Sequence, residues 1–216
     1  GTASGKTTLV NAVLADMVQM APGSRLLLLE DTRELQCPAD NAVAMRTSAE
    51  TDMAQLLRAT LRMRPDRIVV GEVRGAEALD MLQAMNTGHE GSLATVHSNT
   101  TRDALSRLET MIGMGMPNLS DKNIREMMAR ALDIVIQADR LPDGSRRVLA
   151  ITEVTGMEGS VVTTQDIFLF KQAGYDDEGR IRGRFVATGV RPKCMGRLQQ
   201  NGVELPRNHF SWKMPV

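Results

Sequence analysis

Short, continuously apolar runs alternate with longer amphipathic stretches through the N-terminal half of the chain. The apolar runs are residues 25–30, 67–72 and 92–97. The first two runs are short and almost continuously apolar, so each predicts a strand that is buried on both faces, and the third run predicts a further strand. The amphipathic stretches, which predict helices, are residues 7–20, 52–63 and 76–87. Strands and helices that alternate in this way predict a mainly parallel sheet with helices on both faces, which is an α/β fold.

The pattern changes in the C-terminal half. Two more helices are predicted over residues 101–114 and 120–131, the second with Ser120 as its N-cap. An antiparallel hairpin is then predicted around the turn Pro142-Asp143-Gly144, and a further strand over residues 161–170. Residues 174–216 are rich in Gly, Pro and charge and predict an irregular or loosely helical extension. We therefore expect a main domain over residues 1–171 and a C-terminal extension over residues 172–216.

Composition narrows the class of protein. The 216 residues are 42% hydrophobic, which is enough to bury the core of an ordinary globular domain. Lys and Arg number 26 and Asp and Glu number 26, so no net charge attracts the chain to nucleic acid or an anionic membrane. Cys37 and Cys194 share no metal-ligand spacing, and no apolar run approaches the length of a bilayer span. These features favour a protein of the reducing cytoplasm.

The first eight residues, GTASGKTT, supply all but the first position of the phosphate-loop motif G-x-x-x-x-G-K-[ST]. In this motif backbone N–H groups surround the phosphates, the lysine reaches the β and γ phosphates, and the next hydroxyl holds Mg²⁺. Lys6 and Thr7 take these two roles, which implies ATP and Mg²⁺ as cofactors. The predicted nucleotide-binding residues are Gly1, Thr2, Ala3, Ser4, Gly5, Lys6, Thr7 and Thr8.

Polar side chains follow each of the three predicted strands. Glu30 and Asp31 end the first strand, Glu72 ends the second and His97 ends the third. Since the carboxyl ends of parallel strands share one edge of the sheet, these side chains are expected beside the phosphates. Hydrolysis requires a carboxylate that orients or deprotonates water, and Glu72 and Glu30 are the candidates, with the choice between them open. For His97, a contact with the γ phosphate and a purely structural position are both possible.

Several segments resemble the type II and type IV secretion ATPases, a family with a RecA-like fold. The sequence EDTREL at 30–35 is similar to the Asp box, and RPDRIVVGEVR at 64–74 is similar to the atypical Walker B segment. Residues 87–89, TGH, and 95–99, TVHSN, are similar to the His box. The resemblance implies that Glu72 is the catalytic glutamate, that Glu30 organises Mg²⁺ and that His97 senses the γ phosphate.

Within that family the sequence resembles the CpaF branch, whose members assemble Tad-type pili. The resemblance is carried by residues 75–86, 102–109, 151–158 and 188–193. It implies a homo-hexameric ATPase in the cytoplasm, peripheral to the inner membrane through platform proteins, that powers pilus assembly or protein secretion. It also implies that the strand before the phosphate loop and part of the nucleotide site precede residue 1.

The sequence departs from the family pattern at Ala3 and Arg33, and three alternative functions remain open. Arg33 stands where a small residue is more usual. Ala3 stands where the family commonly has glycine, and a positive φ there would weaken the loop. The alternatives are a conjugation or type IV secretion ATPase, a RecA-like nucleic-acid-binding protein, and a nucleotide-binding module that does not hydrolyse ATP. The balanced charge argues against direct binding of nucleic acid.

Overall fold

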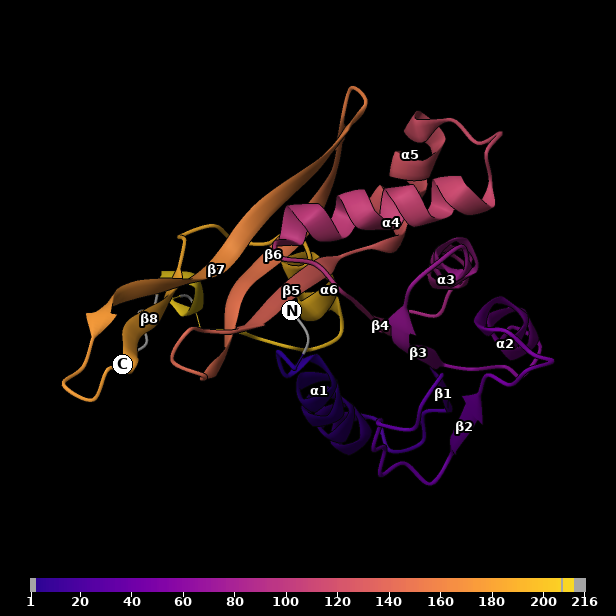
Figure 1. Ribbon diagram of the computed structural model, residues 1–216, viewed down its shortest axis with the longest axis horizontal. Helices are drawn as coiled ribbons and strands as arrows, with labels where there is room; N and C mark the ends of the chain where they lie inside the picture. The colour runs from indigo at the N-terminus through magenta and orange to yellow at the C-terminus, as the bar shows by residue number, and fades with distance from the viewer. Residues whose placement is uncertain (1–2, 207, 212–216) are drawn as a thin grey trace.

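The computed structural model describes residues 3–206 and 208–211, which form two four-stranded sheets and the helices packed on them (Figure 1). One sheet is parallel and the other antiparallel, so the predicted α/β class with a parallel sheet is confirmed. Gly1 and Thr2, which the sequence places in the phosphate loop, lie outside the described residues. None of the helices in the described part of the chain combines the length and apolar composition that a bilayer span requires.

The parallel sheet has the strand order β2-β1-β3-β4. Its strands are β1 (Leu26–Glu30), β2 (Ala42–Arg46), β3 (Arg67–Val73) and β4 (Leu93–Val96). β1 is buried at every position and β3 along most of its length, as the apolar runs predict for central strands. β2 was not predicted, because its short apolar run includes two alanines, which have low strand propensity, and it forms a half-exposed edge strand.

Helices cover both faces of this sheet. α1 (Lys6–Met20) lies on one face, and α2 (Met53–Thr60) and α3 (Glu77–Asn86) lie on the other (Figure 1). Successive side chains of the strands therefore enter different cores: Val69 packs with Leu14 of α1, whereas Val70 packs with α2 and α3. This alternation explains why the strands are apolar at consecutive positions.

Two further helices connect the sheets. α4 (Thr101–Gly115) and α5 (Asp121–Ala131) agree with the predicted ranges, and the Ser120 hydroxyl accepts a hydrogen bond from the N–H of Asn123, as predicted for an N-cap. Both helices contribute to the core that covers the α2 and α3 face.

The antiparallel sheet is larger than the predicted hairpin. Its strands, in the order β5-β6-β7-β8, are β5 (Ile134–Arg140), β6 (Arg146–Glu158), β7 (Val161–Tyr175) and β8 (Ile181–Ala187). The turn between β5 and β6 is the predicted one, with Gly144 at φ 84°. β7 crosses the predicted boundary between residues 171 and 172, and the division of the chain at that point remains a proposal.

The C-terminal extension is more regular than expected. It contains β8, α6 (Met195–Gln200) and the 3₁₀ turn η1 (His209–Ser211). In β8 the buried Ile181 and Gly183 alternate with the exposed Arg182 and Arg184, which is a strand pattern despite the charge. Gly183 is required because a Cβ would lie 2.4 Å from the ring of Phe170.

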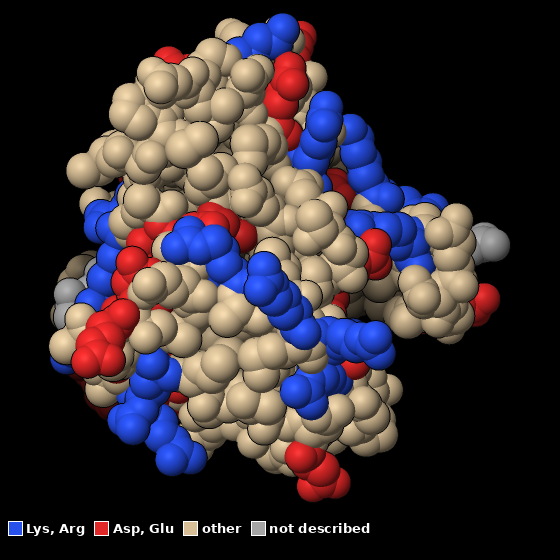
Figure 2. All heavy atoms as spheres, turned by 90° about the vertical axis from the view of Figure 1, so that its right-hand side faces the viewer, with Lys and Arg blue, Asp and Glu red and all other residues tan. Residues whose placement is uncertain are grey.

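Charges on the surface are mixed. On the face turned toward the viewer in Figure 2, Lys and Arg side chains are interspersed with Asp and Glu. This distribution agrees with the equal numbers of acidic and basic residues in the sequence.

The buried carboxylate of Glu153 anchors the extension to the sheet. Its two oxygens accept hydrogen bonds from the backbone N–H groups of Lys193 and Cys194, each at 2.9 Å, at the start of α6. The side chain is 3% exposed, so few water molecules can replace either bond.

We predict that Glu153→Ala lowers the free energy of unfolding by about 2 kcal/mol, because two backbone donors lose their acceptors. Urea unfolding measures this loss, and tryptic cleavage after Lys193 or Arg197 should become faster in the folded protein. Glu158→Ala, at an exposed position of the same strand, is the matched control. Equal stability and equal cleavage in the two variants would contradict the anchoring role.

Candidate functional site

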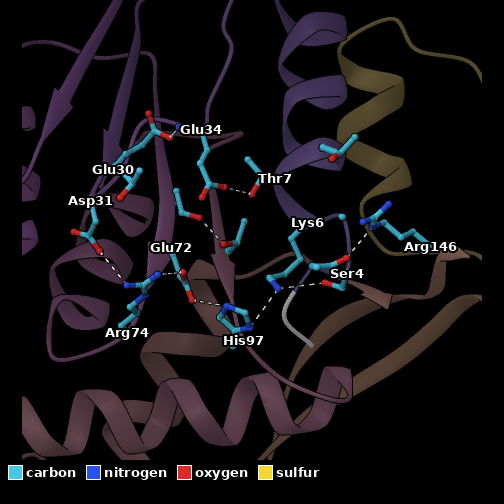
Figure 3. Close-up of a pocket in the computed structure, with 16 residues that line it drawn as sticks. Ser4, Lys6, Thr7, Glu30, Asp31, Glu34, Glu72, Arg74, His97 and Arg146 are labelled. Carbon is cyan, nitrogen blue, oxygen red and sulfur yellow. Dashed lines mark hydrogen bonds and ion pairs between the residues drawn. The ribbon is translucent and has the colours of Figure 1, made fainter. Parts of the chain in front are cut away.

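A pocket of about 550 Å³ lies at the carboxyl edge of the parallel sheet (Figure 3). Its walls are the phosphate loop, the segment that follows β1, the ends of β3 and β4, and the first residue of β6. The lining residues are Ala3, Ser4, Gly5, Lys6, Thr7, Thr8, Glu30, Asp31, Thr32, Glu34, Gly71, Glu72, Arg74, Thr95, His97 and Arg146. Every described residue that the sequence analysis assigned to the site is therefore in this one pocket.

The phosphate loop leads directly into α1. Gly5 has φ 88°, in the left-handed region that favours glycine, and α1 begins at the next residue, Lys6. No side chain caps the first turn of α1, and that turn contains no acidic residue. The N–H groups and the positive end of the helix dipole are therefore oriented to hold an anion.

A chain of polar contacts crosses the pocket from α1 to β3. The Lys6 Nζ lies 3.4 Å from the Nδ1 of His97, and the Nε2 of His97 lies 2.9 Å from the Oε1 of Glu72 (Figure 3). The second oxygen of Glu72 pairs with Arg74, which also lies 3.7 Å from Asp31. The predicted convergence of the strand ends is thus realised through direct contacts.

The charge states of His97 and Glu72 follow from the groups around them. Burial, together with the positive charge of Lys6, lowers the pKa of His97, although Glu72 acts in the opposite direction. A neutral His97 can accept a hydrogen bond from Lys6 at Nδ1 and donate one from Nε2 to Glu72. Burial raises the pKa of Glu72, but the hydrogen bond from Arg74 and the positive charges of Arg74 and Lys6 outweigh that effect, so the pKa is below its usual value. Glu72 is therefore a carboxylate at neutral pH.

Glu30 is buried beneath the pocket. Its Oε1 accepts hydrogen bonds from the backbone N–H groups of Glu34 and Leu35, at 2.8 and 2.7 Å. Gly71 on the neighbouring strand makes room for it, because a Cβ at that position would lie 3.1 Å from the Cγ of Glu30. The carboxylate thus determines the path of the segment that follows β1.

Glu34 is a site residue that the sequence analysis did not single out. Its Oε2 accepts a hydrogen bond from the Thr7 hydroxyl at 2.9 Å, and its carbonyl oxygen accepts one from Asn11 at 3.2 Å. Thr7 and Glu34 thus place a hydroxyl and a carboxylate oxygen side by side, and oxygen ligands are what Mg²⁺ requires. Its place in the segment 30–35, which is similar to the Asp box, was the sequence feature that could have indicated a role in the site.

Arg74 and Arg146 were also missed. Arg74 follows β3 directly and lies two residues after Glu72. This short spacing was the sequence feature that could have indicated their pairing. Arg146 comes from the antiparallel sheet, and its Nε donates a hydrogen bond to the carbonyl oxygen of Ala3 at 2.8 Å. Ala3 itself has φ 62°, the unfavourable conformation anticipated for a residue that replaces glycine.

The chain is similar in sequence to known proteins. Residues 1–185 match the family model described as "Type II/IV secretion system protein". The chain is 53% identical over 154 residues to the probable conjugal transfer protein TrbB of Sinorhizobium fredii, covering 71% of this chain and 46% of TrbB. It is 46% identical over 165 residues to TrbB of Rhizobium radiobacter, and the match covers 76% of this chain and 50% of that protein. The chain thus spans about half the length of the curated relatives it matches.

Two solved structures have a similar fold. The VirB11 ATPase of the Brucella suis type IV secretion system, in complex with sulphate, has a TM-score of 0.64 and 32% identity, covering 69% of this chain and 45% of VirB11. The pilus retraction motor PilT with bound ADP has a TM-score of 0.56 and 29% identity, and the match covers 69% of this chain and 43% of PilT.

We predict that His97 titrates below the ordinary range for histidine, and that Lys6→Ala raises its pKa because a neighbouring positive charge is removed. The ring resonances of His97, followed by NMR as the pH is changed, measure both values. An unchanged or lower pKa in Lys6→Ala would contradict the contact between the two side chains.

Proposed function

Since the chain belongs to the type II/IV secretion system protein family, we propose that it is the ATP-hydrolysing part of a secretion motor. The observation that carries this proposal is the contact chain Lys6–His97–Glu72, which joins the phosphate loop to the end of β3. A cation for the phosphates and a carboxylate for water thus face each other across one pocket. A pocket that only bound nucleotide would not require the carboxylate.

In this proposal the phosphate groups of ATP occupy the loop before α1. The N–H groups at the start of α1 surround the β phosphate, and Lys6 reaches the β and γ phosphates. Lys6 is already directed across the pocket, with its Nζ 3.3 Å from the Ser4 hydroxyl and 3.4 Å from His97. Binding of a γ phosphate would give Lys6 a stronger partner than either of these neutral groups.

The residues present fit a magnesium ion. Thr7 would be the hydroxyl ligand, and Glu34, which lies beside it, would be held near the ion directly or through water. Bound Mg²⁺ would neutralise charge on the phosphate oxygens. Glu30, the sequence-predicted magnesium residue, is proposed to contribute by holding Glu34 in place, since its Oε1 is engaged with the backbone of that segment.

Glu72 is proposed to orient and deprotonate the attacking water. Its lowered pKa keeps it ionised, and His97 and Arg74 each hold one of its oxygens. His97 contacts both Lys6 and Glu72. A γ phosphate that draws Lys6 away from His97 would therefore change the hydrogen bonding of the Glu72 carboxylate. This position supports the predicted role of His97 as a γ-phosphate sensor.

The system that the motor serves is proposed from its relatives. Identity of 53% and 46% to two TrbB proteins favours conjugal transfer, the type IV secretion alternative of the sequence analysis. Assembly of a Tad-type pilus is the second candidate, supported by the CpaF-like segment at 151–158, which lies at the end of β6. In either system we propose a homo-hexamer in the cytoplasm that acts through inner-membrane platform proteins.

We predict that Lys6→Ala and Glu72→Gln each reduce Mg²⁺-dependent ATP hydrolysis by at least about 100-fold in the protein at its full natural length. Lys6→Ala should also weaken nucleotide binding, whereas Glu72→Gln should retain it, because only the second change spares the phosphate contacts. Phosphate release and fluorescent-nucleotide binding measure the two effects.

The exposed Glu50→Gln is the control for that experiment. A parent protein that binds ATP but does not hydrolyse it, at concentrations that permit a hexamer, would favour a nucleotide-binding module and refute the motor. Hydrolysis unchanged in Glu72→Gln would refute the role given to Glu72.

We predict that the full-length protein restores plasmid transfer to a donor strain that lacks TrbB, and that its Glu72→Gln variant does not. Transfer frequency in a mating assay is the measurement. Restoration of Tad pili in a strain without its pilus ATPase, with no restoration of transfer, would instead support the second candidate.

A further inference from the structure

A strained residue lies inside the phosphate loop. Ala3 has φ 62°, and Gly5, two residues later, has φ 88°. Glycine adopts this left-handed region without cost, whereas the Cβ of alanine disfavours it. The conformation of Ala3 must therefore be stabilised by contacts from elsewhere in the structure.

Arg146 supplies such a contact. Its Nε donates a hydrogen bond to the carbonyl oxygen of Ala3 at 2.8 Å, across 143 positions of sequence. Its side chain also covers Gly5, because a Cβ on that glycine would lie 3.1 Å from the Cδ of Arg146. Among the residues that line the described pocket, Arg146 alone comes from the antiparallel sheet.

The hairpin that presents Arg146 is held firmly. At its tip, Asp143 accepts a hydrogen bond from the N–H of Ile181 at 2.7 Å. The next residue in β6, Arg147, donates to the carbonyl oxygen of the same Ile181 at 3.2 Å and lies 5.1 Å over the ring of Phe170. Both backbone groups of one β8 residue thus secure the strand segment from which Arg146 extends.

We propose that Arg146 is a positioning residue that holds Ala3 in its left-handed conformation and so keeps the phosphate loop ready for nucleotide. This contact links the loop through the β5–β6 hairpin to β8. A change in the conformation of the antiparallel sheet would therefore alter the affinity of the loop for nucleotide. The effect on affinity rests on the proposed nucleotide-binding function, but the effect on the loop does not.

The direction from which Arg146 approaches the phosphate loop supports a role through the loop backbone rather than through a phosphate (Figure 3). Arg146 approaches the loop from the side of the backbone carbonyl, whereas Lys6 is directed toward His97 and Glu72. A direct contact between Arg146 and a phosphate is the competing explanation, and it predicts a different response when Ala3 is changed.

The first test needs no nucleotide. Hydrogen–deuterium exchange of the peptide containing residues 4–9 should become at least about fivefold faster in Arg146→Ala, because loss of the hydrogen bond favours other loop conformations. Arg146→Lys should be intermediate, since its amino group can still donate to the carbonyl. Arg182→Ala, an exposed arginine of β8, is the matched control. Unchanged exchange in Arg146→Ala would overturn the proposal.

The second test compares nucleotide affinity in two backgrounds. Arg146→Ala should weaken ATP binding about tenfold in the parent but no more than about threefold in Ala3→Gly, since glycine needs less support in the left-handed region. An equal loss in both backgrounds would overturn the role through Ala3 and indicate a direct phosphate contact. If the parent binds no nucleotide, the proposed function fails, while the exchange experiment still decides what Arg146 does.

Discussion

The alignment of Lys6, His97 and Glu72 is the interaction on which the rest of the site depends. It requires α1 to begin beside the ends of β3 and β4, which the parallel sheet achieves by placing the carboxyl ends of its strands at one edge. Burial and the charge of Lys6 lower the pKa of His97 and so keep it neutral, and Arg74 helps to keep Glu72 ionised. The fold therefore determines both the positions and the charge states of the groups that would act on ATP.

Much of this arrangement could be predicted, because it is encoded locally. Apolar runs identified three strands of the parallel sheet, and the phosphate-loop motif placed Lys6 at the start of a helix. Parallel pairing then brought Glu30, Glu72 and His97 to one edge without knowledge of any contact. The family was recognised from the same segments, whereas its CpaF branch was not confirmed, and the relatives described above include conjugal transfer proteins.

The remainder depends on contacts that are distant in sequence or on weak local patterns. β2 is a half-exposed edge strand with two alanines among its five residues, and β8 contains two arginines and a glycine among its seven, so neither shows the continuous run of large apolar residues of a central strand. The contact of Arg146 with Ala3 depends on how two sheets pack, which no local pattern records. Glu34 belongs to the segment 30–35, but its contact with Thr7 depends on the turn that Glu30 holds, which the sequence alone does not show.

The most direct test of this account is a structure of the full-length protein with Mg²⁺ and a non-hydrolysable ATP analogue, determined by electron cryo-microscopy. We expect the γ phosphate beside Lys6 and facing Glu72 and His97, with the metal ion between the Thr7 hydroxyl and the phosphates. A nucleotide bound outside this pocket, or phosphates turned away from Glu72, would contradict the central claim that these strand ends form the catalytic site.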